Sequence, residues 1–357
     1  MERLDIQTPH KNYPVIIGDG LRFKLTEFLS KSYSAYVIIT DDHVAPLYLE
    51  DVKTALSFST NVFDFVVPAG ETAKSFATYK RLIDDIVALN LDRKSCVIAL
   101  GGGVIGDLAG FVAATFLRGV AFIQMPTTLL SHDSSIGGKV GINHEHGKNL
   151  IGAFYHPEAV LYDTECLKTL PASEWRSGLA EVVKHAIIDS PELYHRMRQE
   201  IPTFDAIDLH TFAPLLKAAM AVKANVVAND ELEAGMRKFL NFGHTLGHAI
   251  EKESGYGVLS HGEAVAIGMI FALRLSERIY HIALPVAEII AWFKRLSLPI
   301  AIPKGLTSQQ LLERMKYDKK RADGHIVFVL LKAIGEPEVT PVEDAVISNL
   351  LAEFING

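Results

Sequence analysis

The pattern of hydrophobic and polar positions divides the chain into two regions with different periodicity. In the first region, short runs rich in Val, Ile and Phe end in Gly, Asp or Pro, as strands do. The predicted strands are residues 3–8, 14–17, 35–40, 62–67, 96–100 and 121–125. Between them, residues 76–89 repeat Leu82, Ile83 and Ile86 at helical spacing. This alternation predicts an α/β domain with a largely parallel sheet.

Beyond Pro171 the pattern changes to long amphipathic runs at helical spacing. The predicted helices are residues 173–188, 213–229, 240–254, 261–279 and 286–295, and a β-like run returns only at 325–331. We therefore expect two domains, an α/β domain over residues 1–170 and a mainly α-helical domain over residues 171–357. A chain of 357 residues is long enough to give each domain its own core.

Charge and composition narrow the classes of partner. The formal net charge is -7, which argues against a nucleic-acid binder but allows a small anionic ligand bound by a local cluster of lysines. We see no apolar run that approaches the length needed to span a bilayer and no apolar signal core at the N-terminus. A cytoplasmic protein without membrane partners is expected. Two cysteines make no disulfide framework, and Cys96 lies in an apolar run typical of a buried thiol.

A glycine-rich turn follows the predicted strand that ends at Leu100. Gly101, Gly103 and Gly106 fit the G-x-G-x-x-G spacing, in which glycines let the backbone approach a pyrophosphate at a helix N-terminus. A tight strand-to-helix turn fits the same residues. The motif also follows several strands, and Gln124 stands where a dinucleotide fingerprint would have an acid. Asp41, at the end of an earlier strand, is the best candidate for a ribose contact.

Residues 125–154 form an unusual polar segment, for which a solvated surface loop is one interpretation. The other is an anion site, because glycines precede Lys139 and Lys148 and would let backbone and ammonium approach an anion together. His144 and His146 lie in a polar turn and are expected to be solvated.

Three segments of the second region carry metal-type side chains. His244 and His248 lie four residues apart, on one helical face, and can chelate zinc. Glu181 lies on an apolar face that would disfavour an unpaired carboxylate, and His261 with Glu263 opens another helix. Histidines with one carboxylate and an open position indicate a catalytic metal site. The spacing alone leaves open which histidine of the pair is the ligand.

Together these segments resemble the 3-dehydroquinate synthase family from end to end. The resemblance rests on PAGETAKS, GGGVIGDLAGFVAA, PTTLL, DSSIGGKVGIN, KNLIGAF, GLAEVVKH, LNFGHTLGHAIE and HGEAVAIGM. It implies a Rossmann-like NAD domain, a helical domain for metal and substrate, zinc or cobalt as the metal, and a homodimer. One departure is that only Ser131 and His132 separate PTTLL from DSS, where many members have three residues. The role of His132 stays open.

The resemblance also implies roles for individual residues. The metal ligands would be Glu181, His244 and His261, with His248 on the phosphate and proton-transfer side. NAD would contact Asp41, Glu71, Lys74, Gly102, Gly103, Val104, Gly106, Asp107, Thr127, Thr128, Lys139, Lys148, Cys166 and Thr169. The substrate would contact Asp133, Lys139, Asn149, Lys184, Lys223, Arg237, Asn241 and one of Lys319 and Lys320, with Lys320 preferred, and Arg118 would reach the neighbouring subunit's site. The catalytic set would be Lys139, Asn149, Lys184, His248 and Glu233, the last as a proton acceptor.

The reaction implied by the resemblance belongs to the shikimate pathway. A carbon–oxygen lyase of this family converts 3-deoxy-D-arabino-heptulosonate 7-phosphate to 3-dehydroquinate and phosphate, and NAD takes a hydride that it later returns. Three alternatives stay open. They are a sister sugar-phosphate cyclase, a metal-dependent polyol dehydrogenase, and a nucleotide-binding module without enzymatic activity.

Overall fold

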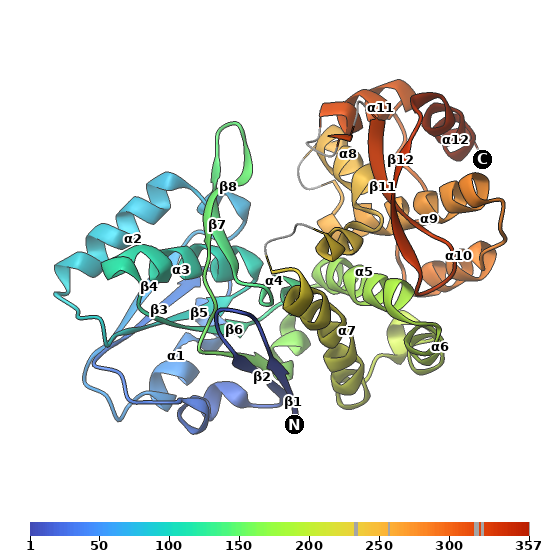
Figure 1. Cartoon of the computed structure of the whole chain (residues 1–357). Coiled ribbons are helices and arrows are strands. Elements are labelled where there is room, and N and C mark those ends of the chain that lie inside the picture. Colours follow the sequence, from blue (N-terminus) through green and yellow to red (C-terminus); the bar gives the residue numbers. More distant parts are fainter. Residues whose placement is uncertain (232–234, 256–257, 318–320, 323–324, 357) are drawn as a thin grey trace. The chain divides into compact units, whose positions relative to one another are not determined.

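The computed structural model describes residues 1–231, 235–255, 258–317, 321–322 and 325–356. The chain divides into two compact units, Met1–Pro171 and Ala172–Gly357. The first unit is a sheet layered between helices, and the second is mostly helical (Figure 1). The two predicted structural classes are thus confirmed, and we describe each unit by itself.

The described residues of the first unit form a seven-stranded sheet in the order β1-β2-β9-β6-β5-β3-β4. The strands are β1 (Glu2–Ile6), β2 (Tyr13–Gly18), β3 (Tyr36–Asp41), β4 (Val62–Val67), β5 (Cys96–Gly101), β6 (Ala121–Pro126) and β9 (Ala159–Asp163). β1 and β2 pair antiparallel, and the other neighbours pair parallel. The largely parallel sheet is confirmed, whereas β9, a short and wholly buried strand, was not predicted.

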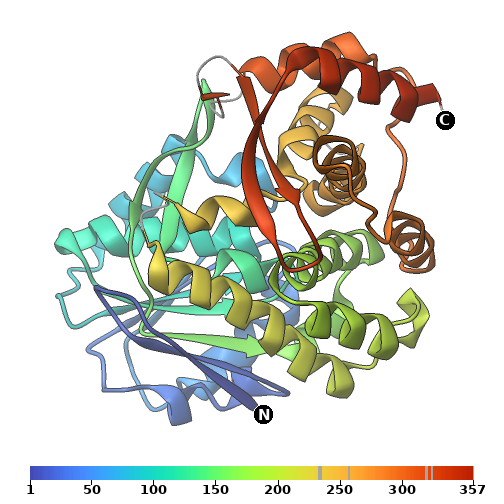
Figure 2. The ribbon, with the colours of Figure 1, turned by 45° about the vertical axis from the view of Figure 1, so that its right-hand side comes forward.

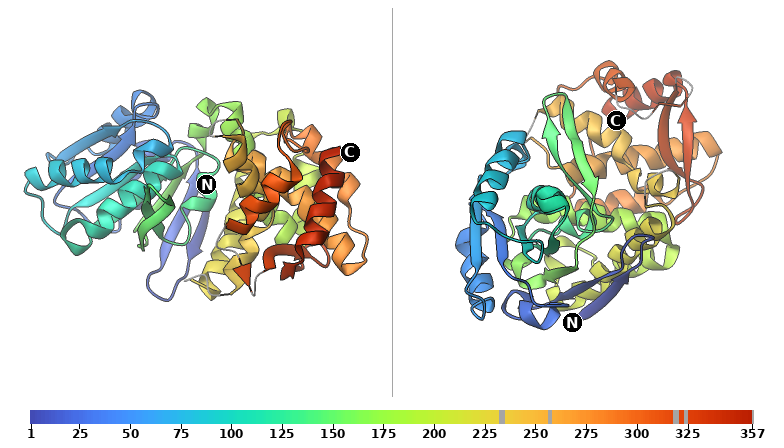
Figure 3. Two further views of the ribbon diagram at one scale, coloured as in Figure 1. Left: turned by 90° about the horizontal axis from the view of Figure 1, so that it is seen from above. Right: turned by 60° about the vertical axis from the view of Figure 1, so that its left-hand side comes forward.

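Helices cover both faces of this sheet, as Figure 1 and the left view of Figure 3 show. Val37 and Ile39 of β3 pack in one core with α2 (Phe76–Ala88) and α3 (Gly103–Thr115). Tyr36 and Ile38 point the other way and pack with α1 (Ala45–Ala55). Since successive strand side chains point to opposite faces, a strand covered on both sides is apolar throughout. This arrangement leaves the strand ends and the connections for polar chemistry.

The polar segment of residues 125–154 is ordered, and its interpretation as a surface loop is wrong. A short helix, α4 (Ser131–Ser134), precedes an antiparallel hairpin of β7 (Lys139–His144) and β8 (Gly147–Phe154), visible in green in the right view of Figure 3. Gly141 and Gly152 face each other in the hairpin, and a Cβ on Gly141 would lie 2.5 Å from the carbonyl oxygen of Ile151. Glycines, which look like loop signals in the sequence, here permit close strand packing.

The helices of the second unit are α5 (Ala172–Asp189), α6 (Pro191–Glu200), α7 (Leu209–Asn229), α8 (His244–Ser254), α9 (His261–Tyr280), α10 (Val286–Arg295), α11 (Ser308–Tyr317) and α12 (Asp344–Asn356). The described residues also form an antiparallel sheet of β10 (Arg321–Ala322), β11 (His325–Leu331) and β12 (Pro337–Val342), drawn in red in Figure 2. The sequence pattern predicted α5, α7, α9, α10 and β11 but missed α6, α11, α12, β10 and β12.

A glycine interrupts the predicted helix of residues 240–254. A 3-10 turn, η7 (Met236–Asn241), ends before Gly243, and α8 begins at His244. Gly243 has φ +78°, and a Cβ there would lie 2.8 Å from the carbonyl oxygen of Val265. A continuous helix is therefore wrong, because only glycine fits this left-handed and crowded position. The break places His244 at the first position of α8.

Among the described residues, one helix, α7, is long and apolar enough to cross a membrane by length and composition alone. The sequence-based statement that no apolar run approaches this length is therefore wrong for α7. Half of the apolar window is buried within the protein, and Leu216 and Met220 belong to its buried face. The core helix of a soluble protein meets the same criterion, so this is weak evidence for a membrane span.

Candidate metal and nucleotide sites

The predicted metal ligands meet where three helices of the second unit converge. Glu181 lies in the middle of α5, and His244 and His261 are the first residues of α8 and α9. The Nε2 atoms of His244 and His261 each lie 3.3 Å from Oε1 of Glu181. Glu181 is 1% exposed, so its carboxylate is shielded from water. The geometry brings together one carboxylate and two imidazoles, the donor types of a catalytic zinc site.

Glycines at the helix crossings bring these ligands together. A Cβ on Gly262 of α9 would overlap the carbonyl oxygen of Ser177 on α5, and one on Gly268 would overlap that of Gly243. Gly247 of α8 faces the backbone of Ala264 and Val265 on α9. Any larger residue would force the helices apart. The positions of the ligands are thus set by backbone packing.

The remaining ring nitrogens fix how each imidazole faces Glu181. Nδ1 of His261 lies 3.1 Å from Oε2 of Glu251, and Nδ1 of His244 lies 3.1 Å from the carbonyl oxygen of Phe242. Both partners are acceptors, so each Nδ1 donates a proton to its partner, and each Nε2 faces Glu181. Such outer partners orient metal-binding histidines in many metalloproteins.

The electrostatics of this cluster favour an anionic carboxylate. Burial alone would raise the pKa of the Glu181 carboxyl, but Lys184, whose ammonium contacts Oε2, and His244 lower it well below its usual range. Burial lowers the pKa of His244 to about 3, whereas Glu181 and Glu251 raise the pKa of His261 to about 9 against the effect of its burial. Within the described part of the chain, neither carboxylate oxygen of Glu181 makes a well-directed hydrogen bond. A divalent cation fits this donor set.

His248 belongs to the same cluster. Its ring centroid lies 5.3 Å from that of His244 and 5.7 Å from that of His261. Nitrogen atoms of the three histidines lie within 4.8 Å of one another, so distance also allows His248 to bind a metal. The assignment of His248 to the phosphate side stays a prediction.

Buried cations accompany the metal-type cluster. Lys184 on α5, Lys223 on α7 and Arg237 in η7 are all buried, although the chain is acidic overall. The guanidinium Nη1 of Arg237 donates to the carbonyl oxygen of Glu231, which fixes its direction. These three predicted substrate residues, with Asn241 at the end of η7, lie on elements that pack against one another. Glu233, Lys319 and Lys320 lie outside the described residues.

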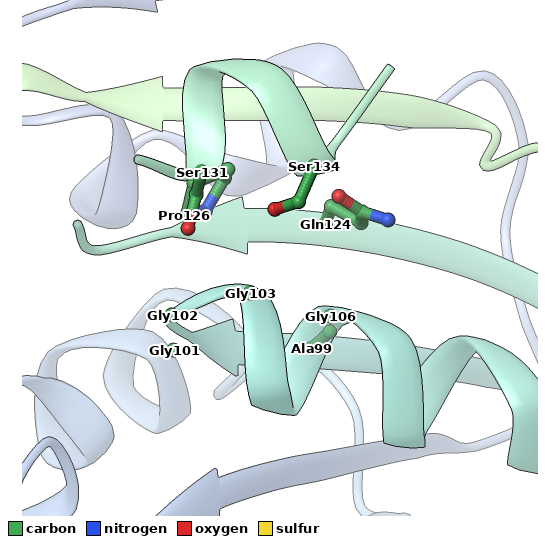
Figure 4. A pocket seen from close by; sticks show the side chains of 9 residues that line it. All are labelled: Ala99, Gly101, Gly102, Gly103, Gly106, Gln124, Pro126, Ser131 and Ser134. Atoms are coloured by element: carbon green, nitrogen blue, oxygen red, sulfur yellow. The ribbon is translucent and has the colours of Figure 1, made fainter. Parts of the chain in front are cut away.

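In the first unit, the glycine-rich turn joins β5 to the start of α3. It lines a small pocket together with residues of β6 and α4, shown in Figure 4: Ala99, Gly101, Gly102, Gly103, Gly106, Gln124, Pro126, Ser131 and Ser134. A Cβ on Gly103 would lie 3.0 Å from Oγ of Ser134, and one on Gly102 would lie 3.0 Å from Cγ2 of Thr128. No described side chain caps this helix N-terminus, whose amides suit an anion.

Helix α3 already begins at Gly103, so Val104, Gly106 and Asp107 lie in its first turns. The side chain of Gln124 lies beside Gly106, and a Cβ there would be 3.7 Å from its Oε1. The pocket therefore offers glutamine where a standard fingerprint has an acid. Asp41 is engaged in the turn that precedes α1, since its Oδ1 accepts the amides of His43 and Val44. Its second oxygen would have to make the predicted ribose contact.

Four other predicted residues meet around one ammonium. Lys74 is 4% exposed, and its Nζ lies 2.6 Å from Oδ2 of Asp107 and 2.5 Å from Oδ1 of Asn149. Oε1 of Glu71 lies 3.9 Å from the same Nζ. The structure thus joins a loop after β4, helix α3 and strand β8 in one polar cluster.

The other predicted residues of this unit lie on connections and on the hairpin. Thr127 and Thr128 follow β6, and Asp133 is in α4. Lys139 and Lys148 are exposed on the hairpin. Cys166 and Thr169 are in the 3-10 turn η5 (Thr164–Thr169), and Arg118 follows α3 with φ +65°. Tyr48 contacts Thr169 through its hydroxyl at 2.5 Å. His144 and His146 are exposed and Cys96 is buried, as predicted.

Two polar residues of these clusters were missed by sequence reasoning. Glu251 lies seven residues after His244, two helical turns along the same face, and this spacing could have revealed it. Asn143 contacts the Lys74 cluster and ends the segment DSSIGGKVGIN, but its spacing from Glu71 and Lys74 in the sequence does not indicate the contact.

Comparisons with known proteins identify the family of the chain. The family descriptions "3-dehydroquinate synthase N-terminal" and "3-dehydroquinate synthase C-terminal" match residues 64–177 and 178–321. A 3-dehydroquinate synthase of Bacillus cytotoxicus is 49% identical over 357 residues, covering 99% of this chain and 96% of that protein. The chain belongs to the 3-dehydroquinate synthase family.

Solved structures share the fold. A 2-deoxy-scyllo-inosose synthase complexed with carbaglucose-6-phosphate, NAD+ and Co2+ superposes with a TM-score of 0.91 at 24% identity, covering 99% of this chain and 100% of that one. A 2-epi-5-epi-valiolone synthase from Streptomyces hygroscopicus subsp. jinggangensis 5008, with NAD+ and Zn2+ bound, gives a TM-score of 0.85 at 26% identity, covering 96% of each chain. Both structures support the predicted fold class.

Proposed function

We propose that this chain catalyses the 3-dehydroquinate synthase reaction, with NAD and one divalent metal as cofactors. Its substrate would be 3-deoxy-D-arabino-heptulosonate 7-phosphate, and its products 3-dehydroquinate and phosphate. Family membership supports the reaction, and the relatives of known structure that bind NAD+ with Co2+ or Zn2+ support the cofactors. The observation that carries the proposal is the buried Glu181 carboxylate facing Nε2 of both His244 and His261.

The clustered side chains of the second unit would bind the metal and the charged groups of the substrate. When bound, the metal supplies a Lewis acid and NAD accepts and returns a hydride. Glu181, His244 and His261 would hold the metal. The buried ammonium of Lys184, beside Glu181, would hold an anionic oxygen of the substrate in place, and Lys223 and Arg237 would add charge for the phosphate and carboxylate.

In the first unit, the amides at the start of α3 would bind the pyrophosphate of NAD. The ammonium of Lys74 would hold the side chains of Asp107 and Asn149 in fixed directions. His248 would exchange a proton with the phosphate, and Glu233 would act as a proton acceptor. We further propose a cytoplasmic homodimer that binds neither nucleic acid nor membrane, with Arg118 reaching the partner's site.

A phosphate-release assay tests this proposal. The purified protein is given the heptulosonate phosphate with and without NAD and a chelator, and absorbance at the nicotinamide band is followed. Phosphate release that needs both cofactors, without accumulation of NADH, is expected. Net NADH formation would instead indicate a polyol dehydrogenase, and faster turnover of glucose 6-phosphate would indicate a sister cyclase.

A further inference from the structure

Asn143, near the end of β7, contacts three residues of the Lys74 cluster with three of its polar groups. Its side-chain amide Nδ2 donates to Oε1 of Glu71 at 2.8 Å. Its Oδ1 accepts the backbone N–H of Asn149 at 2.9 Å. Its backbone N–H donates to the carbonyl oxygen of Lys74 at 2.8 Å. Asn143 therefore ties the turn of residues 71–74 to both strands of the hairpin.

Asn149 needs such support. It has φ +57°, a left-handed backbone conformation that is uncommon for residues other than glycine, although Asn adopts it more readily than most. The hydrogen bond from its N–H to Asn143 holds the backbone there, and Lys74 donates to its Oδ1. Because Oδ1 is engaged, the Nδ2 donors of Asn149 are directed away from Lys74.

The amide direction of Asn143 is also determined by its neighbours. Its oxygen must face the N–H of Asn149, and its NH2 group must face the carboxylate of Glu71. A carboxylate at this position would keep the acceptor for Asn149 but would oppose Glu71 with a like charge. An asparagine is therefore the side chain that satisfies both partners at once.

We propose that Asn143 is a positioning residue, which holds Glu71 and Asn149 in the geometry that binds NAD and substrate. This inference rests on the proposed function, because Glu71 and Asn149 contact NAD and substrate only if that function is correct. Asn143 itself need touch neither molecule. Its effect would pass through two hydrogen bonds of ordinary length to the side chain of Glu71 and the backbone of Asn149.

A charge-rescue experiment on the full-length protein tests the inference. The variants are Asn143→Asp, Glu71→Gln and the double variant, with Glu145→Gln, an exposed change in the turn of the same hairpin, as control. Binding of NAD is measured by calorimetry, and KM and kcat for the heptulosonate phosphate by phosphate release. Thermal unfolding is recorded for every variant.

We expect Asn143→Asp to weaken NAD binding and to raise KM by about tenfold or more, the cost of a charged hydrogen bond replaced by repulsion. In the double variant the Gln amide can donate to the new carboxylate, so NAD affinity should return to within about threefold of Glu71→Gln alone. Glu145→Gln should match the wild type. A role confined to stability would lower the melting temperature without this recovery.

Additive losses in the double variant would overturn the inference, as would wild-type NAD affinity in Asn143→Asp. Failure of the proposed function is a separate outcome, since it would appear as wild-type protein that releases no phosphate from the heptulosonate phosphate. If Asn143→Asp does not fold, Asn143→Ser provides a smaller acceptor. It should keep the melting temperature within about 3 °C of the wild type and still weaken NAD binding.

Discussion

The two units build their polar clusters in opposite ways. In the first unit, the groups predicted to bind NAD lie on turns after strands, at a helix N-terminus and on a hairpin, and many are partly exposed. In the second unit, the predicted metal ligands lie inside a crossing of helices whose backbones nearly touch. Loops on a rigid sheet can shift by small amounts, whereas a buried carboxylate among packed helices cannot. We therefore expect substitutions in the second unit to reduce ligand affinity and stability more than matched substitutions in the first unit.

The largest effect is expected from Glu181→Gln. This change keeps the shape but removes the charge between two imidazoles, and it leaves the buried Lys184 ammonium without its carboxylate. Metal affinity should fall by more than the roughly 10- to 100-fold that loss of an outer partner costs, and turnover should fall with it. Metal counting after dialysis is the measurement, and Glu192→Gln, an exposed change on α6, is the control.

Removing a carboxylate charge in the first unit should reduce cofactor affinity less than Glu181→Gln reduces metal affinity. Asp107→Asn removes the carboxylate beside Lys74 but leaves Asn149 as an acceptor for that ammonium. Weakening of NAD binding by about tenfold is expected, as for one charge-assisted hydrogen bond. A loss of NAD affinity as large as the loss of metal affinity in Glu181→Gln would contradict the contrast between the units.

Glycine-to-alanine substitutions in the two units should differ in their effect on the free energy of unfolding. Gly262→Ala would push its Cβ into the backbone of α5, and we expect it to lower the free energy of unfolding by about 3 kcal/mol or to prevent folding. Gly106→Ala places its Cβ in ordinary contact with Gln124, within a helix that alanine favours by up to about 1 kcal/mol over glycine. Denaturant unfolding compares the two, and similar losses would show that the helix crossing is more tolerant than its geometry indicates.

A smaller effect is expected from Glu251→Gln. The glutamine oxygen can still accept from Nδ1 of His261, so only the charge behind the ring is lost. Metal affinity should fall by about tenfold, and the fall should be larger in Glu251→Ala, which removes the acceptor as well. Competition with a chromogenic chelator gives the affinity, and Glu253→Gln on the same helix is the matched control. Equal metal affinity in all three variants would show that Glu251 does not support metal binding.

The smallest effect is a pH-dependent one in the first unit. Hydrogen bonds from Lys168 and Arg22 lower the pKa of Glu165 below its ordinary value of 4.5. Because the folded pKa is depressed, the stabilisation is present above pH 4.5 and is lost as the pH falls through the folded pKa. Glu165→Gln should therefore cost at most about 1 kcal/mol at pH 7 and less at pH 2.5, measured by urea unfolding. A cost that persists in acid would point to packing.

The sequence pattern predicts elements best where one period dominates. β4 and α10 match the structure at both ends, since alternation and helical spacing are unbroken there. α1 carries Pro46 and several polar residues, and β9 has five residues, so neither gave a clear signal. Gly243 interrupts a predicted helix because its left-handed backbone packs closely against Met269 and Val265, which lie more than twenty residues away in the sequence.

The candidate sites show the same limit. Helical spacing places His244 and His248 on one face, but only the crossing with α5 and α9 brings Glu181 and His261 to them. The resemblance named those ligands because it carries information from related chains. It gave no role to Asn143, whose partners become neighbours only when the hairpin folds beside the turn of residues 71–74.

The glycine crossings of α5, α8 and α9 have a consequence for how a metal would exchange. In zinc fingers the metal orders the chain, so binding and folding are one event. Here the backbone contacts at Gly262 and Gly268 hold the ligands in place as part of the hydrophobic interior. The conformational entropy of ordering the ligands is spent during folding. Chelation should therefore strip the ion reversibly, and reloading should proceed at the rate of ion entry instead of refolding.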